Sequence, residues 1–185
     1  IGPSSSHTVG PMKAAKRYVD NLFRQCNKGS IARIKVTLYG SLALTGEGHG
    51  TLNAIIYGLM GLDAKNVDLE FDYIKECKKS KKIHLNGECK VDFDFDKDFV
   101  LEKKIFLPQH SNGMKFSAYA KNDKIIFEET YFSVGGGTIA RSDEMDRRIE
   151  RKPYDVPYQF DTCKQLMDIC RNEKMTISEI VLKNE

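Results

Sequence analysis

This sequence lacks the paired cysteines that are typical of a metal site. The chain of 185 residues has five cysteines and no Cys-x-x-Cys pair, although zinc and iron–sulfur sites commonly use such pairs. The spacing therefore predicts no zinc or iron–sulfur site made by this chain alone. The odd number of cysteines indicates unpaired thiols, which suit a reducing cytoplasm. The cysteines are Cys26, Cys77, Cys89, Cys163 and Cys170.

Long apolar runs are also absent. No stretch approaches the ~20 apolar residues that a transmembrane helix needs, so the sequence predicts no membrane span. The net charge of +3 indicates no particular partner. The densest basic segment, residues 75–82, contains five lysines without aromatic residues between them, which favours a solvated surface over a nucleic-acid-binding face. A content of 41% hydrophobic and 30% charged residues fits one domain with a core and an appended segment.

Three further features are missing. The chain does not begin with methionine, so we expect a fragment of a longer protein. No lysine motif for pyridoxal phosphate stands out. The glycine triplet at 135–137 is not followed by Gly-Lys-Ser/Thr, so it predicts a bulge or a close backbone approach rather than a phosphate loop.

The opening of the chain gathers hydroxyls and an imidazole between two Gly-Pro pairs. Because proline restricts its own backbone and that of the preceding residue, we expect irregular backbone over residues 4–8 and a helix from Pro11. The N–H groups at the start of such a helix suit an anion such as a carboxylate. A simpler interpretation is that these serines only cap and turn the chain.

Hydrophobic periodicity predicts the remaining elements. An apolar stripe of period 3.6 predicts a helix over residues 11–28, and alternation predicts a strand over 31–44. Residues 51–62 predict a second helix with Thr51 as its N-cap, and residues 115–134 predict a hairpin that turns at 121–124. Short strands are expected near residues 67–71, 83–85, 90–95 and 100–107.

The C-terminal part of the sequence, from residue 141 onward, predicts a linker and short helices. Charge and two prolines over residues 141–157 indicate a linker. Asp161 is expected to cap a helix that ends near residue 172, and Thr176 or Ser178 to cap another. One stripe of the first helix holds Cys163, Leu166, Met167 and Cys170, interpreted as packing residues. The fold class expected overall is α+β, a mixed or antiparallel sheet with helices on one face, followed by a linker and short helices.

The four histidines differ in their surroundings. His84 is expected on the surface and His110 in a turn. His49 lies between Gly46, Gly48 and Gly50, where the backbone can approach a ligand closely. We therefore predict a functional role for His49, together with His7 of the opening segment.

Four segments together resemble the iron–sulfur L-serine dehydratases of the bacterial type. The first is Ile-Gly-Pro-Ser-Ser-Ser-His-Thr-Val-Gly-Pro-Met at residues 1–12, and the second is Tyr-Gly-Ser-Leu-Ala-Leu-Thr-Gly-Glu-Gly-His-Gly-Thr at 39–51. The third and fourth are His-Ser-Asn-Gly-Met at 110–114 and Tyr-Phe-Ser-Val-Gly-Gly-Gly at 131–137. The resemblance implies that residues 1–140 form a beta domain, that 141–157 are a linker, and that 158–185 begin a helical alpha domain.

The resemblance also implies a reaction, in which water is eliminated from L-serine to give pyruvate and ammonia. In the family, cysteines of the alpha domain hold a 4Fe-4S cluster that acts on the hydroxyl, without pyridoxal phosphate. The cluster ligands would then lie outside this chain, in a domain of the same polypeptide or in a partner subunit. A cytoplasmic location is expected and a homodimer is consistent with the family, whereas no nucleic-acid or membrane partner is expected.

Roles for single residues follow from the resemblance. His49 would be the general base, because an imidazole titrates near the working pH, and Thr51 would orient it or the substrate. His7 is the alternative base. One departure is Leu52, which stands where many relatives have aspartate, so a carboxylate that would orient His49 is missing. The residues expected to hold the substrate carboxylate or order the loop are Ser4, Ser5, Ser6, His7 and Thr8, and those expected to line the opposite wall are Asn112 and Gly113.

A function of another class stays open. The beta domain also resembles the serine-sensing domain of some phosphoglycerate dehydrogenases, in which case the chain would bind an amino acid and catalyse nothing. The pairing of the first two segments favours the enzyme.

Overall fold

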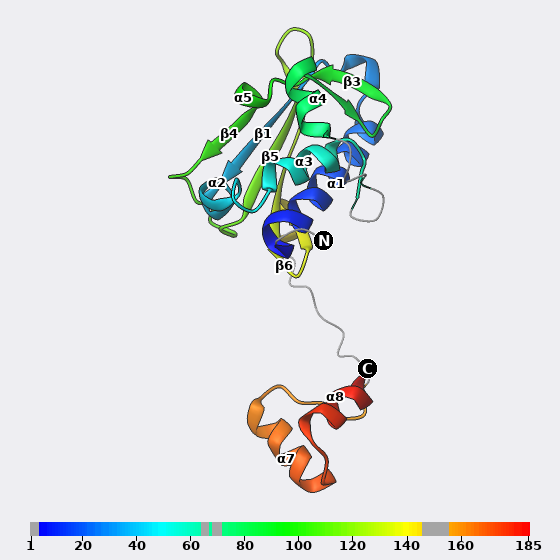
Figure 1. Cartoon of the computed structure of the whole chain (residues 1–185), viewed down its shortest axis with the longest axis vertical. Helices are drawn as coiled ribbons and strands as arrows, with labels where there is room; N and C mark the ends of the chain where they lie inside the picture. Colours follow the sequence, from blue (N-terminus) through cyan, green and yellow to red (C-terminus); the bar gives the residue numbers. More distant parts are fainter. Residues whose placement is uncertain (1–3, 64–66, 68–71, 146–155) are drawn as a thin grey trace. The chain divides into compact units, whose positions relative to one another are not determined.

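The computed structural model describes residues 4–63, 67, 72–145 and 156–185. The chain divides into two compact units, residues 1–147 and residues 148–185 (Figure 1). The first unit contains a sheet and the helices that pack on it, which makes the expected α+β class correct. The second unit contains two short helices.

Seven strands of the described chain form one mixed sheet in the order β2-β3-β1-β5-β6-β7, with β4 also paired to β1. Strand β1 runs parallel to β3 and β4 and antiparallel to β5. The pairs β2–β3, β5–β6 and β6–β7 are antiparallel. The strands are β1 (Arg33–Tyr39), β2 (Lys82–Leu85), β3 (Cys89–Asp92), β4 (Phe99–Glu102), β5 (Gly113–Tyr119), β6 (Ile125–Gly135) and β7 (Thr138–Arg141).

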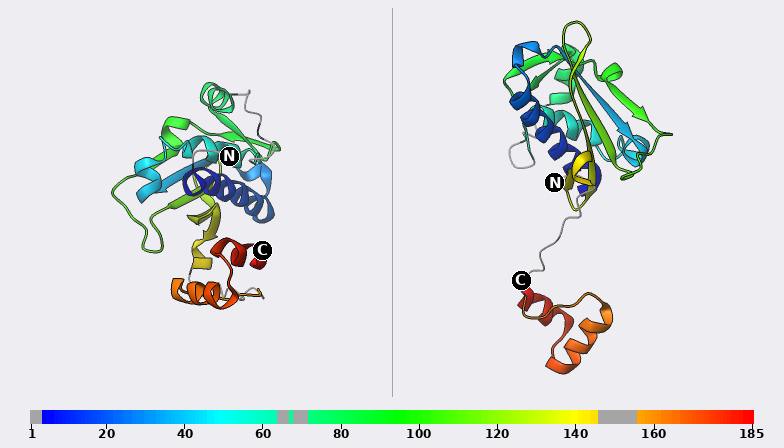
Figure 2. Two further views of the ribbon diagram at one scale, coloured as in Figure 1. Left: turned by 60° about the horizontal axis from the view of Figure 1, so that its bottom comes forward. Right: turned by 180° about the vertical axis from the view of Figure 1, so that it is seen from behind.

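Helices α1 and α3 pack against each other and lie on the sheet (Figure 1, Figure 2). The face of β1 toward them buries Ile34, Val36 and Leu38 completely, while the opposite face of the sheet carries an ion pair between Lys115 and Glu128 at 3.5 Å. The α-helices are α1 (Gly10–Gln25), α2 (Gly40–Thr45), α3 (Thr51–Leu59), α4 (Tyr73–Ser80), α5 (Phe95–Asp98), α6 (Ser142–Met145), α7 (Cys163–Glu173) and α8 (Ile177–Asn184); the π-helix is η1 (Ser5–Val9) and the 3-10 helix is η2 (Lys28–Ser30).

The expectation of irregular backbone at the start of the chain is wrong from Ser5 onward. Residues Ser5–Val9 form the π-helix η1, which leads directly into α1. Ser4 caps this turn, because its hydroxyl accepts a hydrogen bond from the N–H of His7 at 3.1 Å. The cap supplies a partner for an N–H that the start of a helix leaves free.

The strand predicted over residues 31–44 is also too long. It ends at Tyr39, and the next six residues form α2. Gly40 makes this break, since its φ of +52° favours glycine and its N–H donates to the carbonyl of Ile105 at 2.9 Å. A β-carbon at Gly40 would lie 2.6 Å from the carbonyl oxygen of Ser111.

Other predictions vary in outcome. The helix over residues 11–28 and the hairpin over 115–134 are confirmed as α1 and as β5–β6. The glycine triplet makes the turn from β6 to β7, and all three glycines have positive φ. Helix α4, which Asp72 caps, was not predicted. The strand expected near residues 67–71 lies largely outside the described residues.

In the second unit, both helices begin with a capping box. Thr162 and Gln165 cap α7, and Thr176 and Glu179 cap α8. The prediction for Thr176 is therefore confirmed, whereas the cap of α7 lies one residue after Asp161. None of the residues of α7 is buried, so its predicted stripe does not pack into a core within the described residues.

Candidate functional site

The four segments singled out in the sequence lie together in the first unit. Their described parts are residues 4–12, 39–51, 110–114 and 131–137, and they occupy η1 and the start of α1, the α2 turn, the start of β5 and the end of β6. Hydrogen bonds connect them in pairs, as described below.

Three side chains join the first segment to the second. The hydroxyl of Thr8 donates to the carbonyl of His49 at 2.8 Å, and the hydroxyl of Thr51 donates to the carbonyl of His7. The Nε2 atom of His7 lies 3.1 Å from the hydroxyl oxygen of Ser41. The two histidine-bearing segments are thus held against each other at three points.

The third and fourth segments lie next to this pair. The N–H of Ser41 donates to the carbonyl of Ser111 at 3.0 Å. The amide of Asn112 donates to the carbonyl of Ser133 at 3.1 Å, and Ser133 in turn packs against Gly10, where a β-carbon would lie only 2.1 Å from the Ser133 oxygen. A larger residue at position 10 would therefore push the first segment off the fourth.

The contacts of His49 define the tautomer of its neutral ring. Its Nδ1 atom lies 2.9 Å from the carbonyl oxygen of Thr45. A carbonyl oxygen only accepts, so the proton of neutral His49 is on Nδ1 and the lone pair is on Nε2. Leu52 packs against the hydrophobic core, so the carbonyl of Thr45 orients the ring without a carboxylate at position 52. The imidazole is therefore arranged to take a proton at Nε2.

His7 lies beside His49, with the ring centroids 5.0 Å apart. Its Nδ1 atom is 3.0 Å from the hydroxyl oxygen of Ser6, so hydroxyls contact both ring nitrogens. Burial, and then the neighbouring His49, lower the pKa of His7 below its ordinary value of 6.5. His7 is consequently neutral at pH 7.

The remaining predicted residues have mainly structural contacts. Ser4 caps η1, and Ser5 is exposed with its carbonyl accepting from the N–H of Gly10. Asn112 is buried, with its amide bound to the backbone of β6. Gly113 lies in β5, where a β-carbon would be 2.7 Å from a methyl of Leu107.

Thr51 is fully buried and is the first residue of α3, whereas Gly50 is the N-cap. The prediction of Thr51 as N-cap is therefore wrong. Its hydroxyl is directed to the backbone of His7 because the preceding left-handed Gly50 turns the chain there.

Two contacting residues were missed in the sequence, Ser41 and Thr45. Both lie within α2 or at its end, in a stretch predicted partly as strand. The glycine at position 40 was the available signal, because a glycine directly before a polar residue is typical of a turn.

The described residues do not fit a 4Fe-4S cluster. No group of three or more His, Cys, Asp or Glu side chains in the described part of the chain is arranged to hold a metal ion. The five cysteines are unpaired, and burial raises the pKa of Cys77 to about 11, which disfavours the thiolate that a metal needs.

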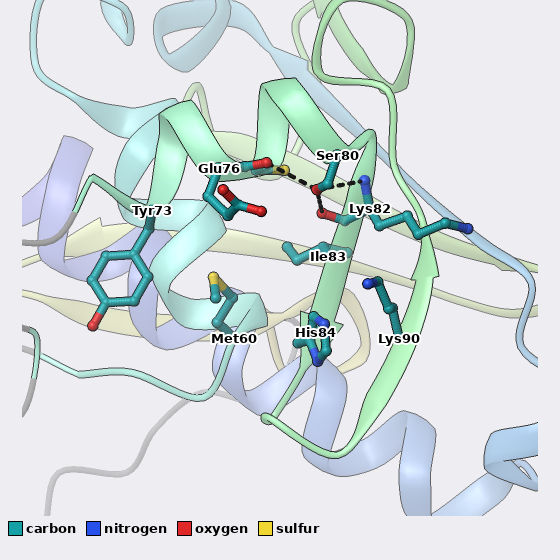
Figure 3. A pocket seen from close by; sticks show the side chains of 9 residues that line it. Met60, Tyr73, Glu76, Ser80, Lys82, Ile83, His84 and Lys90 are labelled. Atoms are coloured by element: carbon teal, nitrogen blue, oxygen red, sulfur yellow. Dashed lines mark hydrogen bonds between the residues drawn. The ribbon is translucent and has the colours of Figure 1, made fainter.

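Two hollows of the surface lie away from the histidine pair. One, of about 80 Å³, lies between α4 and β2–β3 and is lined in part by Met60, Ile83 and His84 (Figure 3). The other contains Gln109, Arg141 and neighbouring residues of β6 and α6. His84 is exposed, as predicted. None of the helices described is long and apolar enough to cross a membrane.

The chain is similar to known proteins over its whole length. Residues 1–144 match the family model described as serine dehydratase beta chain. The whole chain aligns with an L-serine dehydratase of Streptomyces coelicolor at 40% identity, with one of Haemophilus influenzae at 37%, and with L-serine dehydratase 1 of Escherichia coli at 38%. In each case the chain spans 41% of the relative's length. Since the family model covers well over half of its residues, the chain belongs to the serine dehydratase beta chain family.

Proposed function

We propose that this chain is the base-bearing part of an L-serine dehydratase, a lyase that converts L-serine to pyruvate and ammonia. The names of the relatives and the geometry of His49 support this proposal. The observation that carries it is the contact between Nδ1 of His49 and the carbonyl of Thr45, which leaves Nε2 as a proton acceptor.

In the proposed reaction, Nε2 of His49 removes the α-proton of L-serine. The electron pair of the broken C–H bond forms the double bond between the α- and β-carbons, and the C–O bond breaks with its electron pair going to the hydroxyl oxygen. This hydroxyl takes up one proton and leaves as water, which balances the proton that His49 received. The aminoacrylate product tautomerises to an imine, and water then hydrolyses the imine to pyruvate and ammonia. General base catalysis of this kind contributes about 10²- to 10⁴-fold to a rate.

The neighbouring hydroxyls suit the other end of the substrate. Ser6 and Ser41 flank His7, and neutral His7 adds no positive charge that would disfavour protonation of the neighbouring His49. We propose that the carboxylate of L-serine binds beside His7, at one of these hydroxyls.

We also propose that a 4Fe-4S cluster serves the complete protein, held by residues outside this chain, and that the protein acts in the cytoplasm. Because the described residues do not fit the cluster, no step above passes through it.

The test is pyruvate formation from L-serine by the complete protein, purified without oxygen. We expect His49→Gln to lower kcat by about 10²-fold or more and to leave folding unchanged. The matched control is His84→Gln, which changes an exposed histidine on β2 and should keep full activity. Exposure of the wild-type protein to air tests the cluster separately.

Each outcome is informative. Full activity of His49→Gln would assign the base elsewhere, with His7→Gln as the next variant. A protein that binds L-serine but forms no pyruvate, even with its cluster intact, would favour the amino-acid sensor.

A further inference from the structure

A continuous row of hydrogen-bonding groups runs from the first segment to the second. The hydroxyl oxygens of Ser4 and Ser6 are 3.4 Å apart, the oxygen of Ser6 is 3.0 Å from Nδ1 of His7, and Nε2 of His7 is 3.1 Å from the oxygen of Ser41. The row therefore contains three hydroxyls and one imidazole.

The contacts of Ser4 indicate the direction in which these groups donate. The Ser4 oxygen already accepts from the N–H of His7 at 3.1 Å. Its own hydrogen has one neighbour among the described groups, the oxygen of Ser6. If Ser4 donates to Ser6, the hydrogen of Ser6 is directed to Nδ1 of His7. The reverse direction would leave the Ser4 hydrogen without a partner among the residues that the structure describes.

The opposite end of the row follows from this direction. With Nδ1 of neutral His7 accepting, its proton is on Nε2, and Nε2 donates to the oxygen of Ser41. The Ser41 oxygen then accepts within the protein, and its hydrogen is available to a ligand. Ser41 is only partly buried, so a ligand can approach it.

We propose that Ser41 is a substrate-binding residue, which donates a hydrogen bond to the carboxylate of the amino-acid substrate and is oriented for this by His7. The identity of the ligand rests on the proposed function, whereas the direction of the hydrogen bonds does not. A carboxylate is the strongest acceptor that L-serine offers to a hydroxyl.

The two imidazoles then have opposite tautomers. His49 carries its proton on Nδ1, because of the Thr45 carbonyl, and His7 carries its proton on Nε2. One measurement of the two tautomers therefore tests both proposals. The ring of His7 tests the role of Ser41, and the ring of His49 tests the proposed base.

The first experiment is nitrogen NMR of this chain with labelled histidine, at a pH where both rings are neutral. We expect His7 to be protonated at Nε2 and to change its nitrogen shifts in Ser41→Ala, but not in the control Ser30→Ala, which removes an exposed hydroxyl of η2, outside the four segments. A His7 ring protonated at Nδ1 would overturn the inference. A His49 ring protonated at Nε2 would instead contradict the proposed base.

The second experiment uses the complete protein and L-serine. Loss of a hydrogen bond to a charged group should lower kcat/KM of Ser41→Ala by about 10- to 100-fold, mainly through KM. Ser41→Thr, which keeps a hydroxyl, should recover part of the loss, and Ser30→Ala should match the wild type. An unchanged KM in a folded Ser41→Ala protein would refute the role of Ser41 in binding. If Ser41→Ala does not fold, Ser41→Thr and the tautomer of wild-type His7 decide the question.

Discussion

Single hydroxyl groups fix the backbone of the histidine-bearing segments. Thr51 is fully buried and donates to the carbonyl of His7, while Thr8 donates to the carbonyl of His49. The positions of both imidazoles thus depend on two threonine hydroxyls, which bind the backbone carbonyls of the histidines and not their rings. Buried donors of this kind matter because their loss leaves an acceptor unpaired.

Replacement of Thr51 by valine keeps the shape of the side chain and removes the donor. We expect Thr51→Val to lower the free energy of unfolding by about 1–3 kcal/mol, as measured by urea denaturation of this chain. Thr138→Val on β7, where the threonine is exposed, is the control and should change stability little. Equal stability of both variants would show that the His7 carbonyl does not need Thr51.

The lowered pKa of His7 predicts a dependence of stability on pH. Since the pKa is below 6.5 in the folded chain, the unfolded chain takes up this proton first as the pH falls. The contribution of neutral His7 to the free energy of unfolding is therefore complete above about pH 6.5, and it is lost as the pH falls through the lowered pKa. We expect His7→Asn to reduce the fall in urea midpoint between about pH 7.5 and pH 5.5. An unchanged slope in His7→Asn would contradict the shift.

At the scale of elements, α1 and α3 approach each other closely at one glycine. A β-carbon at Gly58 of α3 would lie 2.1 Å from the carbonyl oxygen of Met12 and 2.8 Å from the side chain of Ala15. The carbonyl belongs to the backbone of α1, so it cannot turn aside. This contact fixes the spacing of the two helices, and with it the distance between η1 and the start of α3.

We predict that Gly58→Ala lowers the free energy of unfolding by about 1–3 kcal/mol, as overpacking does, even though alanine favours helix over glycine. The measurement is urea denaturation. Gly29→Ala is the matched control, because its β-carbon would meet only a side-chain oxygen of Asn27 at 3.4 Å. A stabilised Gly58→Ala chain would mean that the helices separate at little cost.

A second contact between elements is an ion-pair network at the end of the sheet. Arg17 of α1 pairs with Glu144 of α6, and Arg141 of β7 pairs with Glu129 of β6 at 2.9 Å. Glu129 is largely buried, with 10% of its side chain exposed. The network ties the last hairpin to α1, and therefore holds the glycine turn beside η1.

At the scale of the whole chain, the two units differ in how much they bury. The hydrophobic core cluster comes entirely from the first unit. Among the described residues of the second unit, only Ile180 is buried. Helices of this length have marginal stability in water without a core.

We therefore expect a chain that ends at Met145 to unfold at the same urea midpoint as the full 185 residues, within about 0.5 kcal/mol of unfolding free energy. A synthetic peptide of residues 156–185 should show little helix by circular dichroism. A large loss of stability on truncation would show that the first unit depends on the residues removed.

The sequence by itself determined the elements whose signals are local. The 3.6-residue period of α1, the alternation of β5 and β6 and the Thr176 cap depend on neighbours within a few residues, so they were predicted correctly. The residues of the four segments were also found, in this case through their resemblance to a known family.

Only the tertiary structure decided how those residues act. Ser41 and His7 are 34 positions apart, and Thr51 and His7 are 44 apart, so no local pattern encodes their contacts. The break after Tyr39 arises because Gly40 meets the backbone of residues 105 and 111. The tautomers of the two imidazoles depend in the same way on partners that folding brings within hydrogen-bond distance, and these partners give His49 a free Nε2.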